Sequence, residues 1–165
     1  MKIKDLLFIV LLCFFCSSFF SQDKKTDSLL NVLKKHSNDT LAAKAYFGLG
    51  TIFIEKGMID TGYYFLKKGF SISKNLNFIR GLAVSNNYLG RVFNYRGNQD
   101  SSVYHFTQAM KYYSELKDSA RMSGMLNNLG VAYKSRGNIS KAMDYYFQAL
   151  KIKDRLHDTE GIASA

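Results

Sequence analysis

Cysteine and histidine are the residues of this chain that could bind a metal ion or act as a nucleophile. Cys13 and Cys16 have the C-x-x-C spacing of redox and metal sites. Both lie in an apolar N-terminal segment that we interpret below as a secretory signal, so cleavage would remove them. His36, His105 and His157 are far apart, and none stands four residues from another metal ligand. We therefore expect no metal site and no cofactor.

The sequence also lacks the short motifs of common enzymes. No serine lies in a Gly-x-Ser-x-Gly elbow, and neither a Walker-type loop nor Gly-x-Gly-x-x-Gly occurs. The expectation is a protein that is not an enzyme. His105 occupies the same repeat position as Phe65 and Tyr145, so we expect it to be a packed or half-exposed helix residue.

Residues 1–21 have the features of a secretory signal. Lys2 and Lys4 precede an apolar run from Leu6 to Phe15, which has the length of a signal core. Small residues follow where cleavage could occur, at Ser17, Ser18 and Ser21. The run is shorter than the roughly 20 residues of a membrane span. The chain is therefore predicted to be exported to a periplasmic or other extracytoplasmic compartment, with an uncleaved N-terminal anchor as the alternative.

The composition favours long helices with a basic surface. The 165 residues include no proline, which would interrupt helices, and 47% of them are hydrophobic. The formal net charge is +10. Such a charge could attract nucleic acid, anionic lipid or acidic peptides. Because no block of like charge occurs, we interpret it as a soluble surface and expect no nucleic acid partner.

The strongest pattern is a repeat of 40 residues. Residues 127–138 match residues 87–98, and these match residues 47–57. Such a period predicts a helical unit stacked several times. The predicted units span 38–77, 78–117 and 118–157. A capping half-unit at 22–37 precedes them, and 158–165 begins a fourth unit that is cut short.

Each unit is predicted to contain two helices joined by a tight turn. Gly57, Gly97 and Gly137 mark the turns, because glycine adopts the left-handed conformation that ends a helix. Acceptor side chains three residues later are expected to be the N-caps of the second helices, at Asp60, Asp100 and Ser140. The corresponding N-caps of the first helices are expected at Asn38, Asp118 and Asp158, with Asn77 replacing Phe78.

Small residues recur in register on both helices of each unit. The first helix carries Leu-Gly followed three residues later by an aromatic residue, at Leu49, Gly50 and Phe53, at Leu89, Gly90 and Phe93, and at Leu129, Gly130 and Tyr133. The second helix pairs a small residue with a large one, as in Gly62 and Leu66, Ser102 and Phe106, and Ala142 and Tyr146, followed by Gly69, Ala109 and Ala149. A mid-helix glycine costs about 1 kcal/mol relative to alanine. Its recurrence therefore indicates that helix backbones approach closely beside large side chains.

These residues resemble the tetratricopeptide repeat, whose pattern is Leu-Gly-x-x-Tyr followed by small-x-x-x-aromatic. The resemblance covers almost all of the chain after the signal. The chain departs from the family in its period of 40 rather than 34, in lacking the early tryptophan and in lacking the closing proline. The longer period is similar to that of kinesin light chains and Rap-type bacterial regulators. The resemblance implies an all-α fold, a right-handed α-solenoid of stacked antiparallel helix pairs.

The resemblance also implies that a peptide or protein partner binds on a concave face lined by the first helices. Four residues of the second unit share one helix face by their spacing, and the third unit repeats that face. The predicted partner-binding residues are Asn87, Arg91, Asn94, Tyr95, Asn127 and Lys134, with Val131 and Ser135 beside them. The equivalent first-unit residues are Lys44, Phe47, Thr51 and Glu55. Asn87 and Asn127 are favoured because an amide side chain can both donate to and accept from a peptide backbone. The alternative is that these asparagines only bond to a neighbouring helix or face water.

The unfinished fourth unit suggests two further readings. Exported arrays of this kind often form the sensing front of bacterial histidine kinases or helix-turn-helix regulators, so the chain is expected to be part of a larger protein. Alternatively it is a structural or assembly protein that self-associates through its uncapped last helix. A membrane contact is expected only through an uncleaved N-terminus or a downstream segment.

Overall fold

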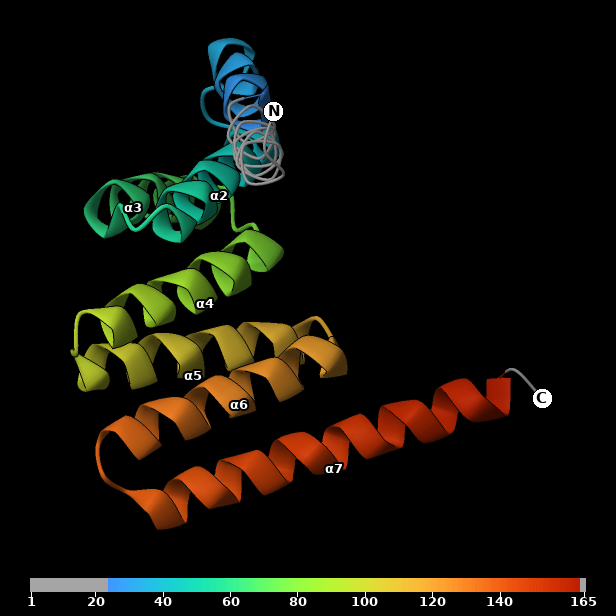
Figure 1. The fold of residues 1–165 in the computed structure, drawn as a ribbon. Coiled ribbons are helices and arrows are strands. Elements are labelled where there is room, and N and C mark those ends of the chain that lie inside the picture. Colours follow the sequence, from blue (N-terminus) through green and yellow to red (C-terminus); the bar gives the residue numbers. More distant parts are fainter. Residues whose placement is uncertain (1–23, 164–165) are drawn as a thin grey trace, which may run out of the picture.

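A computed structural model of the chain describes residues 24–163 and, for side chains, residues 24–156. Seven helices and no strand occur within this range (Figure 1). A leading helix covers residues 24–35, and the others are α2 (Thr40–Glu55), α3 (Ile59–Asn75), α4 (Ile79–Tyr95), α5 (Gln99–Glu115), α6 (Ser119–Ser135) and α7 (Ile139–Ala163). The predicted signal at 1–21, with both cysteines, lies outside the described residues. None of the helices in the described part is long and apolar enough to cross a membrane.

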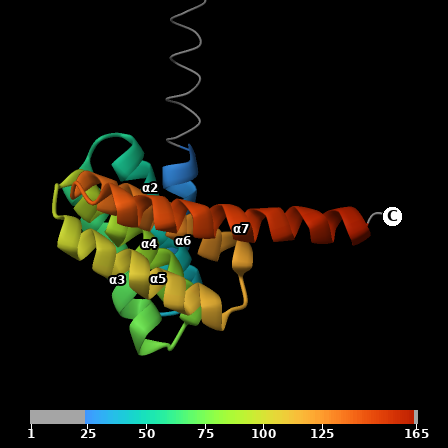
Figure 2. The same ribbon diagram turned by 90° about the horizontal axis from the view of Figure 1, so that it is seen from below.

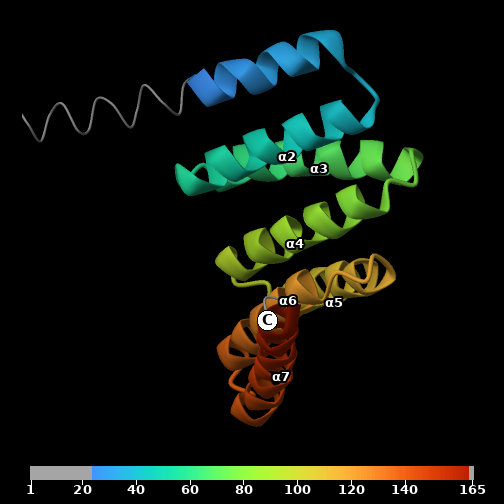
Figure 3. The same cartoon turned by 90° about the vertical axis from the view of Figure 1, so that its right-hand side faces the viewer.

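The helices stack as antiparallel pairs. α2 packs on α3, α4 on α5 and α6 on α7, while α3 with α4 and α5 with α6 join successive pairs. α7 crosses the end of the stack and projects beyond the other helices (Figure 2). The direction of the helices turns steadily along the stack. In Figure 3 the leading helix therefore lies across the view, whereas α7 is seen end-on. The predicted all-α solenoid is therefore confirmed, while its right-handed sense and the exact unit boundaries stay predictions.

The turns inside the pairs are built as the glycines predict. Gly57, Gly97 and Gly137 have φ values of 78°, 71° and 80°. The residue after each glycine donates its amide back to the preceding helix, as from Asn98 N to Phe93 O at 2.9 Å. The same turn follows α3 and α5 without glycine, because Asn77 and Lys117 adopt φ values of 51° and 54°. One backbone device therefore ends five successive helices.

The predicted N-caps of the second helices are wrong. Each second helix begins two residues after its glycine, because the turn needs only one residue beyond it. The capping positions are therefore Met58, Asn98 and Asn138 instead of Asp60, Asp100 and Ser140. Asn98 and Asn138 each accept a backbone amide at 3.0 Å, whereas Met58 offers no acceptor.

Asp60 and Asp100 instead link one pair to the next. Each lies in the first turn of a second helix and forms an ion pair with the arginine that ends the following first helix. Asp60 pairs with Arg96, and Asp100 pairs with Arg136 at 2.5 Å. Both carboxylates are largely exposed, so each pair contributes at most about 1 kcal/mol. The two ion pairs join equivalent positions of successive helix pairs, so they are consistent with one register along the stack.

The N-caps of the first helices were predicted in part. Asp118 caps α6, as expected, and accepts from Arg121 N at 3.1 Å. The cap of α2 is Asp39 rather than Asn38, and it accepts from Ala42 N at 2.8 Å.

Two other predicted caps do not form. Asn77 lies in the turn with positive φ, so Phe78 becomes the N-cap of α4 and supplies no side-chain acceptor. Asp158 caps no new helix, because α7 continues through it to Ala163.

The core is organised around the small residues. A methyl group on Gly50 would lie 2.8 Å from Leu66, one on Gly90 would lie 2.6 Å from Phe106, and one on Gly130 would lie 2.4 Å from Tyr146. These contacts are closer than carbon atoms tolerate, so each glycine receives the large side chain of its partner helix. The spacing predicted a close approach of helices beside large side chains, and the structure adds which residues meet. Leu66 and Phe106 are almost fully buried as a result.

A polar pair replaces this apolar packing at the middle of the stack. Asn86 is 3% exposed, and its Nδ2 donates to Leu82 O at 2.8 Å. Its Oδ1 lies 2.9 Å from Nδ1 of His105, whose ring stacks on Phe93 at 5.2 Å between centroids. His105 is thus half-buried and packed, as predicted. Burial lowers the pKa of His105, and the charge of Lys67 lowers it further.

This lowered pKa predicts a loss of stability in mild acid. The folded chain holds the His105 proton less tightly than the unfolded chain, so the free energy of unfolding should fall as pH drops below about 6.5. His105→Gln can still donate to Asn86 but does not titrate, and it should remove this part of the pH dependence. Lys67→Gln should only weaken it. Urea unfolding between neutral pH and mild acid measures this, and an unchanged slope for His105→Gln would contradict the assignment.

Candidate functional site

The predicted site lies on adjacent first helices. We use "first-helix surface" for Asn87, Arg91, Asn94 and Tyr95 of α4 with Asn127, Val131, Lys134 and Ser135 of α6. None of these side chains is fully buried. The helical spacing places each set of four on one side of its helix, away from the buried Leu82 and Leu89.

The asparagines form a link between these two helices. Asn128 Nδ2 donates to Asn87 Oδ1 at 3.1 Å, and the two side chains are half-buried. The alternative reading of Asn87, a bond to a neighbouring helix, is therefore present in the structure. Asn127 is half-buried beside this contact. Sequence reasoning missed Asn128, although the doublet of adjacent asparagines in α6 was a signal.

The remaining residues of the first-helix surface differ in their exposure to solvent. Tyr95 is 62% exposed, and Lys134 is exposed. The Arg91 guanidinium lies over the Tyr88 ring at 5.4 Å, which holds its charge above an aromatic face. Oδ1 of Asn94 is enclosed and has no hydrogen-bond donor within the described part of the chain. Tyr95, Arg91 and Lys134 are therefore the side chains most able to meet a partner.

The expected first-unit continuation needs one correction. Phe47 is only 6% exposed, because Gly69 receives its ring. It belongs to the core rather than to an open face, although one edge borders a groove. Lys44 and Glu55 are exposed, and the Thr51 hydroxyl donates to Phe47 O at 2.8 Å.

The groove beside Phe47 is an apolar hollow in the described part of the chain. It has a volume of about 330 Å³ and lies where the leading helix, α2 and α4 meet. Its lining residues are Lys25, Lys44, Phe47, Gly48, Thr51, Phe78, Arg80, Gly81, Val84 and Tyr88. The sequence prediction included only three of these, all from α2. The rest come from segments whose proximity depends on the stacking.

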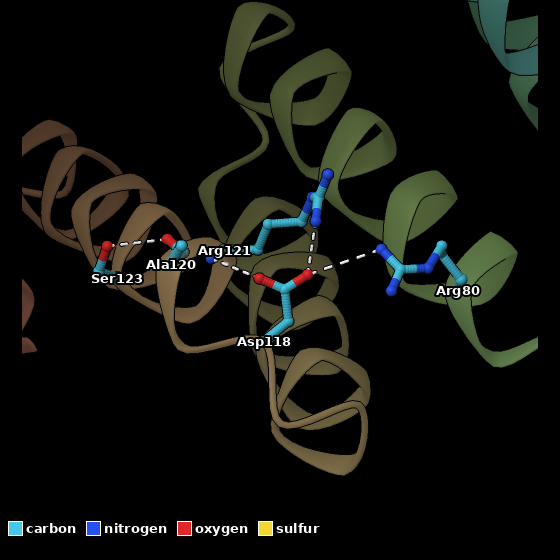
Figure 4. A network of polar contacts seen from close by, with 5 residues as sticks. All are labelled: Arg80, Asp118, Ala120, Arg121 and Ser123. Carbon is cyan, nitrogen blue, oxygen red and sulfur yellow. Dashed lines mark hydrogen bonds and ion pairs between the residues drawn. The ribbon is translucent and has the colours of Figure 1, made fainter. Parts of the chain in front are cut away.

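Arg80, at one edge of the groove, belongs to a small charge network (Figure 4). Arg121 donates to Asp118 at 2.5 Å, and Arg80 lies 3.6 Å from the same carboxylate. Burial alone would raise the pKa of Asp118, but the hydrogen bonds and charge of Arg121 outweigh it and hold this pKa below its usual range. Two guanidinium groups therefore share one carboxylate.

Residues with metal-binding side chains do not gather in the described part of the chain. No group of three or more histidine, cysteine, aspartate or glutamate residues there is arranged to hold a metal ion. The first-helix surface instead offers hydrogen-bonding amides, cations and aromatic faces.

Comparison with known proteins gives one family match. The tetratricopeptide repeat family model matches residues 125–155, which lie inside the predicted third unit. A search of curated protein sequences found no match.

Solved structures share the fold at low sequence identity. BtubC (BKLC) from P. vanneervenii aligns with a TM-score of 0.74 and 19% identity, over 89% of this chain and 62% of that one. A putative kinesin light chain from Podosopora anserina with nearly identical TPR-like repeats gives 0.65 and 16%, over 79% and 64%. The TPR domain of Arabidopsis FLU gives 0.64 and 12%, over 68% and 95%.

This chain therefore spans less than two thirds of the BtubC and kinesin light chain structures. The identities are too low to transfer a partner, and the likeness shows the fold alone. The family match therefore applies to residues 125–155, and the solved structures show that the chain shares a helical solenoid fold with them.

Proposed function

We propose that this chain is a binding module that holds a peptide or protein segment on its first-helix surface. The observation that carries the proposal is the alignment of Asn87, Arg91, Tyr95 and Lys134 on adjacent first helices, outside the core. Exposed tyrosine and arginine are the residue types that most often anchor partners.

The cellular setting of the module is also a proposal. Its signal-like N-terminus supports export to an extracytoplasmic compartment. The apolar face that α7 leaves open supports a place in a larger protein whose next helix would cover it. We infer that this protein is a regulator, in which the array senses a partner and passes the result to a histidine kinase or helix-turn-helix domain.

The double variant Asn87→Ala and Asn127→Ala tests the binding surface. Peptides selected on the purified chain from a displayed random library should bind this variant about tenfold more weakly, since two hydrogen bonds at about 0.5–1.5 kcal/mol each are lost. Titration calorimetry measures the change. The control double variant Asn31→Ala and Asn75→Ala, which alters exposed asparagines elsewhere, should bind normally. Full affinity in a correctly folded Asn87/Asn127 variant would disprove the site.

A second candidate function is self-association through α7. Three apolar side chains on this helix, Met143, Phe147 and Leu150, are 50%, 63% and 52% exposed and recur at helical spacing. The residues at the positions of Met143 in earlier pairs, Tyr63 and Val103, are partly buried against the core clusters. The positions of Met143 and Leu150 are therefore covered in earlier pairs and open on α7, whereas Phe147 corresponds to the exposed Lys67 and Thr107. An assembly role would follow if a second copy covered it.

Light scattering at increasing concentration separates this candidate from the first. A self-associating chain should gain mass with concentration, and Phe147→Glu should return it to a monomer because it places a charge in the contact. Tyr104→Glu is the matched control, since Tyr104 is 59% exposed on α5. A monomer at every concentration would exclude the assembly role.

A further inference from the structure

The groove between α2 and α4 has a charge pattern that points to its occupant. Three of its ten lining residues are cations, Lys25, Lys44 and Arg80, and none is acidic. The Lys44 ammonium lies 5.9 Å from the Phe78 ring centroid. Arg80 shares Asp118 with the closer Arg121, so this edge keeps an excess of positive charge.

The interior of the groove is apolar. Phe47, Phe78, Val84 and Tyr88 supply large side chains. Gly48 stands at the repeat position of Tyr88 and Asn128 and contributes only backbone atoms to the groove. Leu29 of the leading helix packs against Gly48, so a larger residue there would displace Leu29. A methyl group on Gly48 would lie 2.9 Å from Leu29 Cδ1. The volume of about 330 Å³ is at the lower end for ligand pockets, which suits one or two large side chains.

The start of α4 adds to the positive edge. Phe78 is its N-cap and provides no side-chain acceptor. The first turn, with Arg80 and Gly81, borders the groove. The positive end of the α4 dipole therefore lies beside the same cations, and an anion would be favoured there.

We propose that this groove binds an acidic peptide segment that inserts one large apolar side chain. The inserted side chain contacts Phe47, Val84 and Tyr88, while flanking carboxylates meet Lys44 and Arg80. The proposal rests on the proposed binding function and names the chemistry of the partner. It also places the main contact with the peptide in the groove between α2 and α4, rather than at the predicted asparagines of α4 and α6.

A designed peptide tests this directly. The probe is a fluorescent heptapeptide with a central phenylalanine and two glutamates on each side, measured by anisotropy against the full chain. Binding should weaken with salt. Lys44→Gln combined with Arg80→Gln should lower the affinity about tenfold, as expected for two partly exposed ion pairs. Lys68→Gln combined with Lys111→Gln removes the same charge outside the groove and should leave the affinity nearly unchanged.

Two altered peptides test the two halves of the chemistry. Replacing the glutamates by glutamine, or the phenylalanine by alanine, should each reduce binding about tenfold. Equal binding of either peptide would overturn the corresponding half. Absence of binding by the original peptide, or full binding by the folded Lys44/Arg80 variant, would overturn the proposal as a whole.

The outcomes separate this proposal from the one on which it rests. Peptide binding that depends on Asn87 and Asn127 but not on Lys44 and Arg80 would reject the groove and retain the first-helix surface. A single-stranded oligonucleotide, or vesicles of anionic lipid, that displaced the peptide with the same Lys44/Arg80 dependence would show a general anion site and would also reject the proposal. Circular dichroism of each variant confirms that folding is intact.

Discussion

The close approach of paired helices at Gly50, Gly90 and Gly130 is the constraint on which the rest of the structure depends. A side chain at these positions would collide with Leu66, Phe106 or Tyr146. Because the large residue of the second helix sits over the glycine of the first, each pair locks in one register. The same register then determines which helix faces pack against the next pair and which stay exposed.

The surface follows from this packing. Once the pairs are locked and stacked, α2, α4 and α6 are brought side by side, and Arg91, Tyr95 and Lys134 lie outside the core. The Asn128–Asn87 bond and the Asp60–Arg96 and Asp100–Arg136 ion pairs all join one helix pair to the next. A binding surface on a solenoid is therefore a consequence of core geometry, and its chemistry can vary without changing the fold.

The fold could be predicted from the sequence because its information is local and repeated. Three copies of Leu-Gly and three turn glycines specify helices, turns and close contacts within about 40 residues. The caps were harder, because each second helix begins two residues earlier than the pattern of Asp60 and Asp100 suggested. Phe47 was misplaced for a different reason. Its burial depends on Gly69, a partner on another helix whose small size compensates for the bulk of Phe47.

The candidate site was predicted only in outline. Shared helical faces indicated Arg91, Tyr95 and Lys134 correctly as residues outside the core. The groove was not visible, because Lys25, Lys44 and Arg80 lie far apart in the chain and meet only through stacking. Sequence periodicity describes one helix at a time, whereas a hollow between helices depends on the side chains of three.

Comparison of two helical glycines tests the central claim most directly. Gly90 receives Phe106, whereas a methyl group on Gly124 would meet nothing within 4 Å. We expect Gly124→Ala to raise the free energy of unfolding by up to about 1 kcal/mol, through helix propensity alone. Gly90→Ala should lower it by about 2 kcal/mol, because it overpacks the contact with a buried ring. A Gly90→Ala variant that is stabilised as much as Gly124→Ala would contradict the account.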